Sequence, residues 1–435
     1  MNPILIGIIG ILALLLLLFF RMHIGVAMAL VGFVGVAIVT NGILPAIGYF
    51  KTVPFNTAAN FNLSVIPMFV LMGEFMFFSD VSGDLYSASY KLLGRLRGGL
   101  AMATIVASSG FAAICGSATA TTATMGAVSL PEMRKYNYKD SLSTGSISAG
   151  GTLGILIPPS TGFILYGTTA TISIAKMFAA GMLPGIVLAL CYMAVVAVIT
   201  FIDKDAGPSG GRYTIVQKLR AAVGVFPALV LFVVVIGGIL GGWFTATEGG
   251  AIGAFGAFVI MVFKRKCNWK NLVGSLRETI KITAMIFLII IGAYIFGYFL
   301  TLSHFPDQLA KWAIGLDVNR YVILIFMLVV YAVLGCFVDS LPLIVLLTPI
   351  FLPIVTTLEF NPMWFGVLMV MIMQLGLITP PVGMCCYVMK GVAPEVPLEK
   401  IFKGTAPFII GLIVAVAIVI SFPNIATWLP SVMDF

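Results

Sequence analysis

The sequence predicts an all-α membrane protein that crosses the bilayer many times and is built from two inverted-topology repeats. Three observations lead to this fold class. Hydrophobic residues make up 60% of the 435 residues and charged residues only 9%, whereas a soluble domain carries about 25% charged residues. The apolar residues gather in segments close to the ~20 residues that a helix needs to span a bilayer. The chain also contains two similar halves, and each is interrupted by a Pro-Pro pair.

Ten apolar segments follow one another along the chain. The first resembles a signal peptide, but it lacks a basic start and a small-residue cleavage site, so we expect a retained helix. The stretches between the segments leave no room for a soluble catalytic or nucleic-acid-binding domain. The segments are 3–20, 24–45, 61–78, 143–172, 177–202, 221–243, 247–263, 280–302, 362–392 and 404–426.

The segment between Arg97 and Arg134 is tight for two full membrane crossings. Its middle reads CGSATATTATMG, at 115–126, so small and polar residues stand where the turn is expected. We predict a re-entrant helical hairpin at about 98–134, whose tip stops near mid-membrane. Irregular backbone at that depth has to be covered by protein or line a wet cavity.

The segment between Arg320 and Glu359 has the same character and carries Asp339 at its middle. It predicts a second re-entrant hairpin at about 320–358. Amphipathic stretches at 84–98 and 307–316 precede the two hairpins and are expected to be interfacial arms.

The distribution of basic residues predicts the orientation in the membrane. Threading the elements from a periplasmic N-terminus places 20 of the 24 Lys and Arg residues on the cytoplasmic side, which is the bias expected of cytoplasmic loops. A double crossing at either hairpin would preserve the sides, so the charge bias leaves re-entrance open. The same bias explains the net charge of +8 without any nucleic-acid partner. The basic residues left outside are Lys51, Lys176, Lys311 and Arg320.

Two pairs of matching stretches indicate an internal duplication. LGILIPPST at 153–161 is echoed by LGLITPPVG at 375–383, which superimposes the two Pro-Pro pairs at an offset of 222 residues. AKMFAAGMLP at 175–184 is echoed by EKIFKGTAP at 399–407 after a small indel. In the threading above, the first hairpin enters from the cytoplasm and the second from outside. The repeats are therefore predicted to be inverted, a layout that places binding sites at mid-membrane.

The Pro-Pro pairs are expected to unwind two helices where each faces a hairpin tip. Proline in a helix interior costs about 3 kcal/mol, and the carbonyls that it frees find no water in lipid. An unwound segment exposes carbonyls that bind cations and half-helix N-termini that receive anions. A proline kink without ligand chemistry is the structural alternative. The repeat offset also superimposes Ser117 on Asp339, so the two hairpin middles coincide.

The repeat sets the domain organisation that we expect. The predicted parts are an extra N-terminal transmembrane helix at 1–22, the first inverted repeat at 23–202, a cytoplasmic linker plus connecting transmembrane helix at 203–243, and the second inverted repeat at 244–435.

Five motifs resemble the large membrane subunit (DctM-like) of tripartite ATP-independent periplasmic (TRAP) transporters, and the resemblance runs over nearly the whole chain. These motifs are CGSATATTATMG (115–126), GGTLGILIPPS (150–160), FTATEGGAIG (244–253), GCFVDSLPLIVLLTPI (335–350) and QLGLITPPVGM (374–384).

The resemblance implies sodium-driven uptake of an organic acid, by an elevator mechanism, across a bacterial inner membrane. Sialic acid and C4-dicarboxylates are the substrate classes in view, and no residue decides between them. The implied partners are membrane lipid, a periplasmic substrate-binding protein and a small four-helix membrane subunit. A single extra helix at 3–20 cannot supply that subunit, so we expect a separate polypeptide.

The first hairpin tip and the first Pro-Pro break are expected to form one sodium site by the family pattern. Hard cations take oxygen ligands, and loop carbonyls supply them without a buried charge. Packing between closely approaching helices is the alternative role for any single Ser or Thr here. The candidate ion ligands are Gly116, Ser117, Gly154 and Pro158, and the candidate substrate contacts are Ser117, Thr119, Ser160 and Thr161.

The second tip and the second break are expected to form another sodium site. Asp339 stands out, because a carboxylate at mid-membrane is costly and is a functional candidate by default. A carboxylate that is merely hydrogen-bonded to backbone is the alternative. The candidate ion ligands are Gly335, Val338, Asp339, Thr379, Pro381 and Gly383, and the candidate substrate contacts are Asp339 and Ser340.

Other reactive residue types point to structure and not to catalysis. Glu74 and Glu248 lie nearer helix ends and are expected to be scaffold contacts. The six cysteines form no CxxC pair, and the two histidines are too isolated for a metal cluster. An intramembrane enzyme would need a Ser/His/Asp set, HExxH or paired catalytic carboxylates, and none appears. A stand-alone sodium-coupled carrier of related fold stays open, and occluding hairpins argue against a passive channel.

Overall fold

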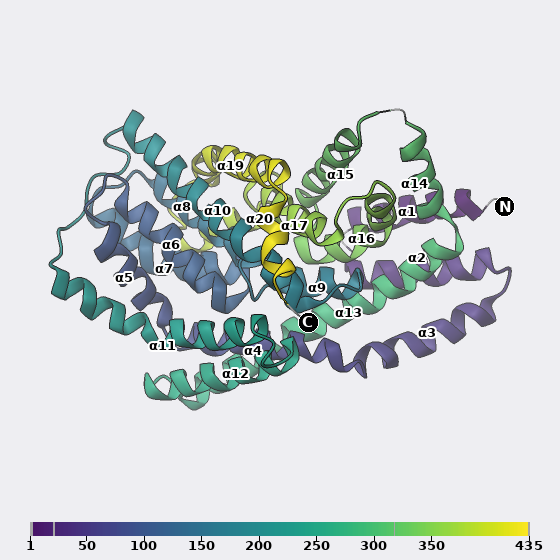
Figure 1. The fold of residues 1–435 in the computed structure, drawn as a ribbon, viewed down its shortest axis with the longest axis horizontal. Helices are drawn as coiled ribbons and strands as arrows, with labels where there is room; N and C mark the ends of the chain where they lie inside the picture. The colour runs from purple at the N-terminus through teal and green to yellow at the C-terminus, as the bar shows by residue number, and fades with distance from the viewer. Residues whose placement is uncertain (1–2, 21, 317, 434–435) are drawn as a thin grey trace.

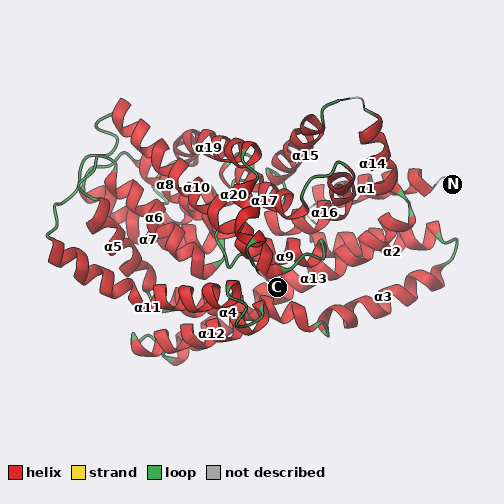
Figure 2. Ribbon diagram, viewed as in Figure 1, coloured by secondary structure: helices red, strands yellow, loops and turns green. Residues whose placement is uncertain are grey.

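The computed structural model describes residues 3–20, 22–316 and 318–433, and this part of the chain is helical without any strand (Figures 1 and 2). Two short 3-10 helices, η1 and η2, accompany the α-helices. The elements are α1 (Pro3–Phe19), α2 (Ile24–Val39), α3 (Ile43–Ala58), η1 (Phe61–Ser64), α4 (Val65–Phe78), α5 (Val81–Leu93), α6 (Gly99–Cys115), α7 (Ala118–Lys135), α8 (Asp140–Thr152), η2 (Leu153–Ile155), α9 (Thr161–Thr169), α10 (Ile174–Ile202), α11 (Ile215–Leu240), α12 (Ala246–Phe263), α13 (Trp269–Leu302), α14 (Phe305–Gly315), α15 (Arg320–Gly335), α16 (Ser340–Thr357), α17 (Pro362–Ile378), α18 (Met384–Val392), α19 (Leu398–Ser421) and α20 (Asn424–Ser431).

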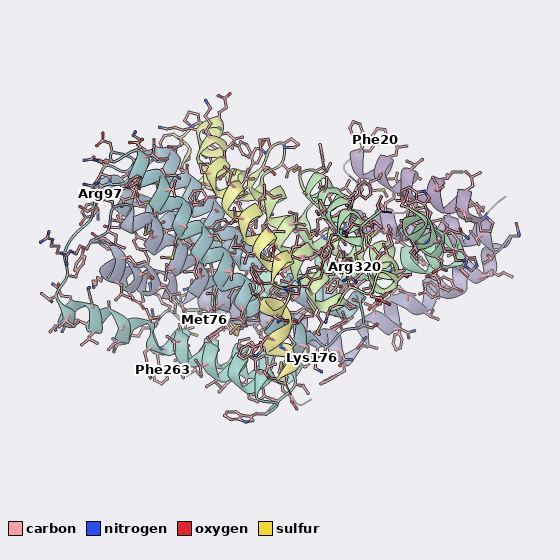
Figure 3. The ribbon with its side chains drawn as sticks, turned by 45° about the horizontal axis from the view of Figure 1, so that its top comes forward. Phe20, Met76, Arg97, Lys176, Phe263 and Arg320 are labelled. Atoms are coloured by element: carbon pink, nitrogen blue, oxygen red, sulfur yellow. The ribbon has the colours of Figure 1, made fainter. Side chains whose placement is uncertain are left out.

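Seven helical segments of the described chain are long and apolar enough to cross a membrane, which confirms the polytopic fold class. Large apolar side chains cover the outside of the molecule, as hydrocarbon surroundings require. Phe20 and Phe263 lie at its periphery in Figure 3 and are 71% and 83% exposed. The seven segments are Phe61–Phe78, Ile174–Ile202, Ile215–Leu240, Ala246–Phe263, Trp269–Leu302, Ser340–Thr357 and Leu398–Ser421.

Both predicted hairpins appear as two helices joined by a short tip. In the first half, α6 and α7 meet at Gly116 and Ser117. In the second half, α15 and α16 meet over residues 336–339. The helices α6 and α15 have 17 and 16 residues, which is short of the ~20 that span a bilayer.

Both Pro-Pro stretches interrupt a helix, as the sequence predicts. The first interruption separates α8 and η2 from α9, and the second separates α17 from α18. The Pro158–Pro159 and Pro380–Pro381 peptide bonds are both cis. The two halves therefore present the same order of arm, hairpin, broken helix and long helix: α5 to α10 in one and α14 to α19 in the other.

The structure contains a helix, α3, that the apolar segments do not predict. The expected segment 24–45 is divided, because α2 ends at Val39 and α3 begins at Ile43. Polar residues and Pro54 dilute the hydropathy of α3, so the helix escapes a search for apolar segments. Figure 1 shows α3 beside α2 and α13 at one end of the molecule. The predicted repeat boundaries at 23–202 and 244–435 stay predictions.

Glycines let two sets of helices pack closely. In the first set, α2 and α13 are in contact, and a Cβ on Gly292 would lie 2.1 Å from the Gly25 carbonyl oxygen. In the second set, α8 and α19 join the two halves, and a Cβ on Gly404 would lie 2.1 Å from the Ser141 carbonyl oxygen. Small residues at helix contacts are the usual means of close packing in a membrane, where lipid provides no hydrophobic drive between helices.

Candidate functional site

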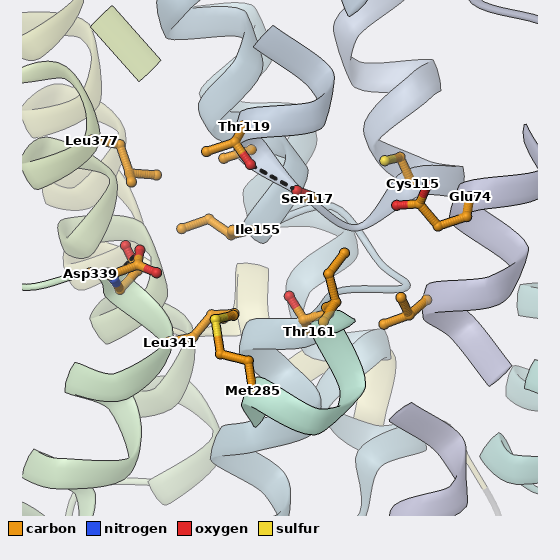
Figure 4. Close-up of a pocket in the computed structure, with 14 residues that line it drawn as sticks. Glu74, Cys115, Ser117, Thr119, Ile155, Thr161, Met285, Asp339, Leu341 and Leu377 are labelled. Carbon is orange, nitrogen blue, oxygen red and sulfur yellow. Dashed lines mark hydrogen bonds between the residues drawn. The ribbon is translucent and has the colours of Figure 1, made fainter. Parts of the chain in front are cut away.

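A cavity of about 150 Å³ lies where the two hairpin tips approach each other (Figure 4). Five parts of the chain build it: the tip of α6 and α7, the first Pro-Pro break, the tip of α15 and α16, Leu377 near the end of α17, and a wall from α4 and α13. The lining residues are Val70, Glu74, Cys115, Ser117, Ala118, Thr119, Ile155, Thr161, Ile282, Met285, Asp339, Ser340, Leu341 and Leu377.

The first tip turns at a glycine and starts a capped helix. Gly116 ends α6 with φ +64, a left-handed conformation that suits glycine, and a Cβ there would lie 2.7 Å from the Pro159 carbonyl oxygen. Ser117 then caps α7, because its Oγ accepts a hydrogen bond from the Ala120 backbone N–H at 3.4 Å. The Ser117 and Thr119 hydroxyls lie 3.3 Å apart, within hydrogen-bond distance (Figure 4). The tip therefore offers hydroxyl oxygens to the cavity from a constrained turn.

The first break is tied to this tip by backbone and hydroxyl contacts. Thr161 Oγ1 donates to the Gly116 carbonyl oxygen at 3.1 Å. Gly154 lies so close that a Cβ would stand 2.5 Å from the Ser117 carbonyl oxygen. Ser160 is fully buried and caps α9 by accepting from the Phe163 N–H at 3.4 Å, while its hydroxyl donates to the Ile155 carbonyl. Ser160 is thus occupied by local hydrogen bonds.

The second tip carries the carboxylate that the sequence singles out. Asp339 caps α16, and its Oδ1 accepts a hydrogen bond from the Ser340 N–H at 2.7 Å. The Asp339 residue is exposed and lines the cavity, whereas Ser340 is only 3% exposed. One carboxylate oxygen thus satisfies a helix-end donor, and the side chain still faces the space between the tips.

The second break is tied to the second tip in a similar way. Thr379 Oγ1 lies 3.2 Å from Cys336 Sγ, and the Val382 N–H donates to the Cys336 carbonyl at 3.3 Å. A Cβ on Gly376 would lie 2.0 Å from the Gly335 carbonyl oxygen. In each half, then, a glycine at the same repeat position lets the broken helix touch the backbone of its own hairpin tip.

Three helices begin at the cavity. Ala118, Thr161 and Ser340 are the first residues of α7, α9 and α16, and all three line the space. A helix N-terminus carries unpaired N–H groups and about half a positive charge, so it favours anions. The cavity can therefore receive an anion through backbone groups while carbonyl and hydroxyl oxygens remain for cations.

The wall from α4 and α13 adds a carboxylate that the sequence prediction leaves outside the site. Glu74 lies on α4 beside Cys115 and faces Asp339 across the cavity (Figure 4). Its neighbour Gly73 allows this approach, because a Cβ there would lie 2.8 Å from the Cys115 carbonyl oxygen. The sequence did contain a pattern that could have identified Glu74 as a site residue: a charged residue inside an apolar segment is a functional candidate by default.

The structure brings most of the predicted substrate residues together. Ser117, Thr119, Thr161, Asp339 and Ser340 line the cavity, whereas Ser160 lies behind it. Glu248 lies elsewhere and caps α12, where its carboxylate accepts from the Thr245 N–H at 2.8 Å. The remaining predicted ion ligands do not line this cavity and stand in or beside the tips and breaks: Gly116, Gly154, Pro158, Gly335, Val338, Thr379, Pro381 and Gly383.

Comparison with known proteins matches nearly the full length. The family model of the tripartite ATP-independent periplasmic transporter DctM component matches residues 11–425. The C4-dicarboxylate TRAP transporter large permease protein DctM of Pseudomonas aeruginosa is 34% identical over 87% of this chain and 88% of its own. The sialic acid TRAP transporter large permease protein SiaM of Vibrio cholerae is 31% identical over 85% of this chain and 86% of its own.

Two further relatives extend the comparison. The isethionate TRAP transporter permease protein DctMQ of Oleidesulfovibrio alaskensis is 35% identical over 92% of this chain, which spans 61% of that longer protein. Among solved structures, the YdaH transporter of Alcanivorax borkumensis superimposes with a TM-score of 0.61 over 88% of this chain and 89% of its own, at 14% identity. The solved structure supports the fold, and the family match together with the sequence relatives identifies this chain as a member of the DctM family, the large permease subunits of TRAP transporters.

Proposed function

We propose that this chain uses a sodium gradient to take up an organic acid, of the sialic acid or C4-dicarboxylate class, across a bacterial inner membrane. It receives the acid from a periplasmic binding protein and works beside a small four-helix membrane subunit, with its own N-terminus in the periplasm. The observation that carries the proposal is the cavity at which both hairpin tips, one Pro-Pro break and three helix N-termini meet.

The oxygen atoms around the tips support sodium as the coupling ion. Sodium is a hard cation and binds carbonyl, hydroxyl and carboxylate oxygens, like calcium and magnesium. The first tip and break offer the Ser117 and Thr119 hydroxyls beside unwound backbone, and the second tip offers Asp339. Discontinuous helices supply the ion sites of many secondary transporters in this manner.

The packing of the hairpins supports an elevator-type movement. The two hairpins and the two broken helices pack into one unit, with α7 against α8 and α18, α8 against α19, and α16 against α9 and α17. The wall from α4 and α13 contacts this unit with mostly apolar side chains, including Val70, Ile282 and Met285. Apolar contacts are non-directional, so a unit of this kind is able to slide along the wall without breaking a hydrogen-bond ladder. Substrate and ions would travel with the hairpins while α4 and α13 stay in place.

Uptake into proteoliposomes tests the sodium coupling. The vesicles contain this chain, its small membrane subunit and the binding protein, and a panel of labelled acids is supplied outside. Uptake is expected with an inward sodium gradient and without ATP. Equal uptake after potassium or choline replaces sodium on both sides would contradict the proposal.

Omission of each partner tests the tripartite arrangement. This chain alone is expected to transport little, and addition of the small subunit and the binding protein is expected to restore uptake. Full activity of the isolated chain would instead favour a stand-alone sodium-coupled carrier of related fold.

A further inference from the structure

The charges around the cavity are unusual for a site that receives an acid. Two carboxylates line it, Glu74 on one side and Asp339 on the other (Figure 4). Among the described residues, its lining includes no Lys, Arg or His. Within this cavity, a negative group on the substrate therefore meets no cationic side chain of the described lining.

One negative charge on the substrate can still be accommodated. The N-termini of α7, α9 and α16 open on the cavity and favour an anion, and co-bound sodium would add positive charge near Asp339. A second negative charge at the far end of the substrate meets no cationic side chain among the described lining residues. It would approach one of the two carboxylates, since Glu74 and Asp339 lie on opposite sides of the space. Like charges about 10 Å apart at an effective dielectric constant of about 20 disfavour binding by roughly tenfold or more.

The rest of the lining suits hydroxyl groups. Four side-chain hydroxyls border the cavity, and each both donates and accepts hydrogen bonds. The lining also includes apolar side chains such as Ile155 and Leu377, and this mixture fits a carbon chain bearing hydroxyl groups. A carboxylate wall also accepts hydrogen bonds from substrate hydroxyls. The four hydroxyl residues are Ser117, Thr119, Thr161 and Ser340.

We infer that the transported acid is a hydroxylated monocarboxylate, and that Glu74 excludes acids with a second carboxylate. This inference rests on the proposed function and narrows its substrate class. Glu74 lies on helix α4 and not on a hairpin. In this structure the hairpin tips stand beside α4, so a substrate in the cavity meets Glu74, which acts there as a specificity residue.

Matched pairs of acids test the inference without the binding protein, whose own preference would mask that of the cavity. Threonate and tartrate share a four-carbon hydroxylated chain, and gluconate and glucarate share a six-carbon one. Within each pair the second acid replaces a terminal CH₂OH with a carboxylate. The readout is thermal stabilisation of the purified membrane complex, this chain with its small subunit, in sodium buffer at about pH 8, where free carboxylates are ionised.

The monocarboxylates are expected to stabilise the complex at concentrations about tenfold lower than their dicarboxylate mates. Glu74→Gln is expected to shrink that ratio to about twofold, and Glu74→Asp, which keeps the charge, is expected to restore it. Glu399→Gln is the matched control, because Glu399 is exposed in the first turn of α19 and does not line the cavity. Formation of the complex with the small subunit, and a melting temperature without added acid close to that of the unmodified complex, show that Glu74→Gln is folded.

Each contrary result has a separate meaning. Equal stabilisation by tartrate and threonate in the unmodified complex would overturn the inference about substrate class. An unchanged ratio in Glu74→Gln would overturn the role of Glu74. Sodium-driven uptake with the binding protein, but no stabilisation by any of these acids, would leave the proposed function standing and refute the charge selection. Absence of sodium-driven uptake of every acid would refute the proposed function itself.

Discussion

The two halves of the chain use the same backbone plan in different surroundings. In the first half, every residue from 151 to 160 is buried, and the tip offers only neutral hydroxyls. In the second half, Pro380 and Pro381 are exposed, Phe337 is 64% exposed, and the tip carries Asp339. The two halves therefore share the positions of the break and the tip. They differ in the residue types at the tip and in how far the break is buried.

The difference follows from what packs around each hairpin. The first hairpin contacts α4, α5, α8 and α10, which enclose it within the chain. In the second hairpin, α16 packs against α9, α13, α14 and α17, but α15 packs mainly against α17, and the other face of α15 presents large apolar side chains to the outside, such as Phe326 at 59% exposure. Such a face suits membrane hydrocarbon. A charged tip in the second half thus stays reachable, whereas a charge in the enclosed first half would have little solvent to stabilise it.

The largest expected effect comes from removing the negative charge of Asp339 at the second hairpin tip. Asp339→Asn keeps the shape and hydrogen-bonding capacity of the side chain but removes its charge. Sodium-driven uptake is expected to fall roughly 100-fold, because the loss of a contact to a charged group costs about 1.5–3 kcal/mol. Ser117→Ala, at the repeat-equivalent position, is expected to cost less because neighbouring carbonyls remain as ligands. Uptake at graded sodium concentrations measures both variants, with expression and complex formation as controls.

A wild-type rate and sodium dependence in Asp339→Asn would show that the accessible tip is not the coupling site. The neutral first tip would then be the principal candidate for the ion site, in place of the charged second tip.

The contact between each broken helix and its tip gives the next effect. Gly154→Ala and Gly376→Ala would place a Cβ 2.5 and 2.0 Å from backbone carbonyl oxygens, so backbone has to move. Each variant is expected to lose about 1–3 kcal/mol of stability, with a lower melting temperature of the purified complex. Gly391→Ala is the control, because nothing lies within 4 Å of its Cβ position and no loss is expected. A melting temperature at the level of this control would show that the contact is dispensable.

A smaller effect is expected from the hydroxyl that joins the first break to the first tip. Thr161→Val removes the hydrogen bond to the Gly116 carbonyl at 3.1 Å and keeps the shape of the side chain. Loss of one such bond costs about 1 kcal/mol, so we expect uptake to fall about fivefold. Thr161→Ser keeps the hydroxyl and is expected to retain activity. Equal uptake by the Val and Ser variants would show that the Thr161 hydroxyl does not contribute to transport.

The smallest effect is expected at an exposed ion pair between the halves. Glu395 pairs with Arg134, and its own backbone N–H together with Arg134 lowers the pKa of the Glu395 carboxyl below 4.5. A lowered pKa in the folded state contributes stability above the ordinary value, and this contribution is lost as the pH falls through the folded value. Both groups are exposed, so Glu395→Gln is expected to lower the melting temperature only slightly at neutral pH. The difference from the unmodified protein should vanish in acid, and a difference that grows in acid would contradict the assignment.

Sequence patterns predicted the elements of the site well but not its walls. The repeat and the hydropathy pattern located both hairpins and both breaks within a few residues, because small polar tips and Pro-Pro pairs interrupt long apolar runs. The same pattern hid α3, whose polar residues dilute its hydropathy. It also gave Glu74 no place in the site, because nothing in linear order relates α4 to the tip at Cys115.

By itself the sequence determined the membrane class, the family and the duplicated plan, since composition, hydropathy and motif order are properties of the chain alone. The tertiary structure decided which of the candidate oxygens share one cavity. Ser117 and Ser160 look alike in sequence as serines at a tip or a break, but Ser160 is fully buried and its hydroxyl donates to the Ile155 carbonyl, whereas Ser117 lines the cavity. The physical reason is packing: a polar side chain can reach a ligand only where helices distant in sequence leave room beside it and nearby backbone groups do not use all of its hydrogen-bonding capacity.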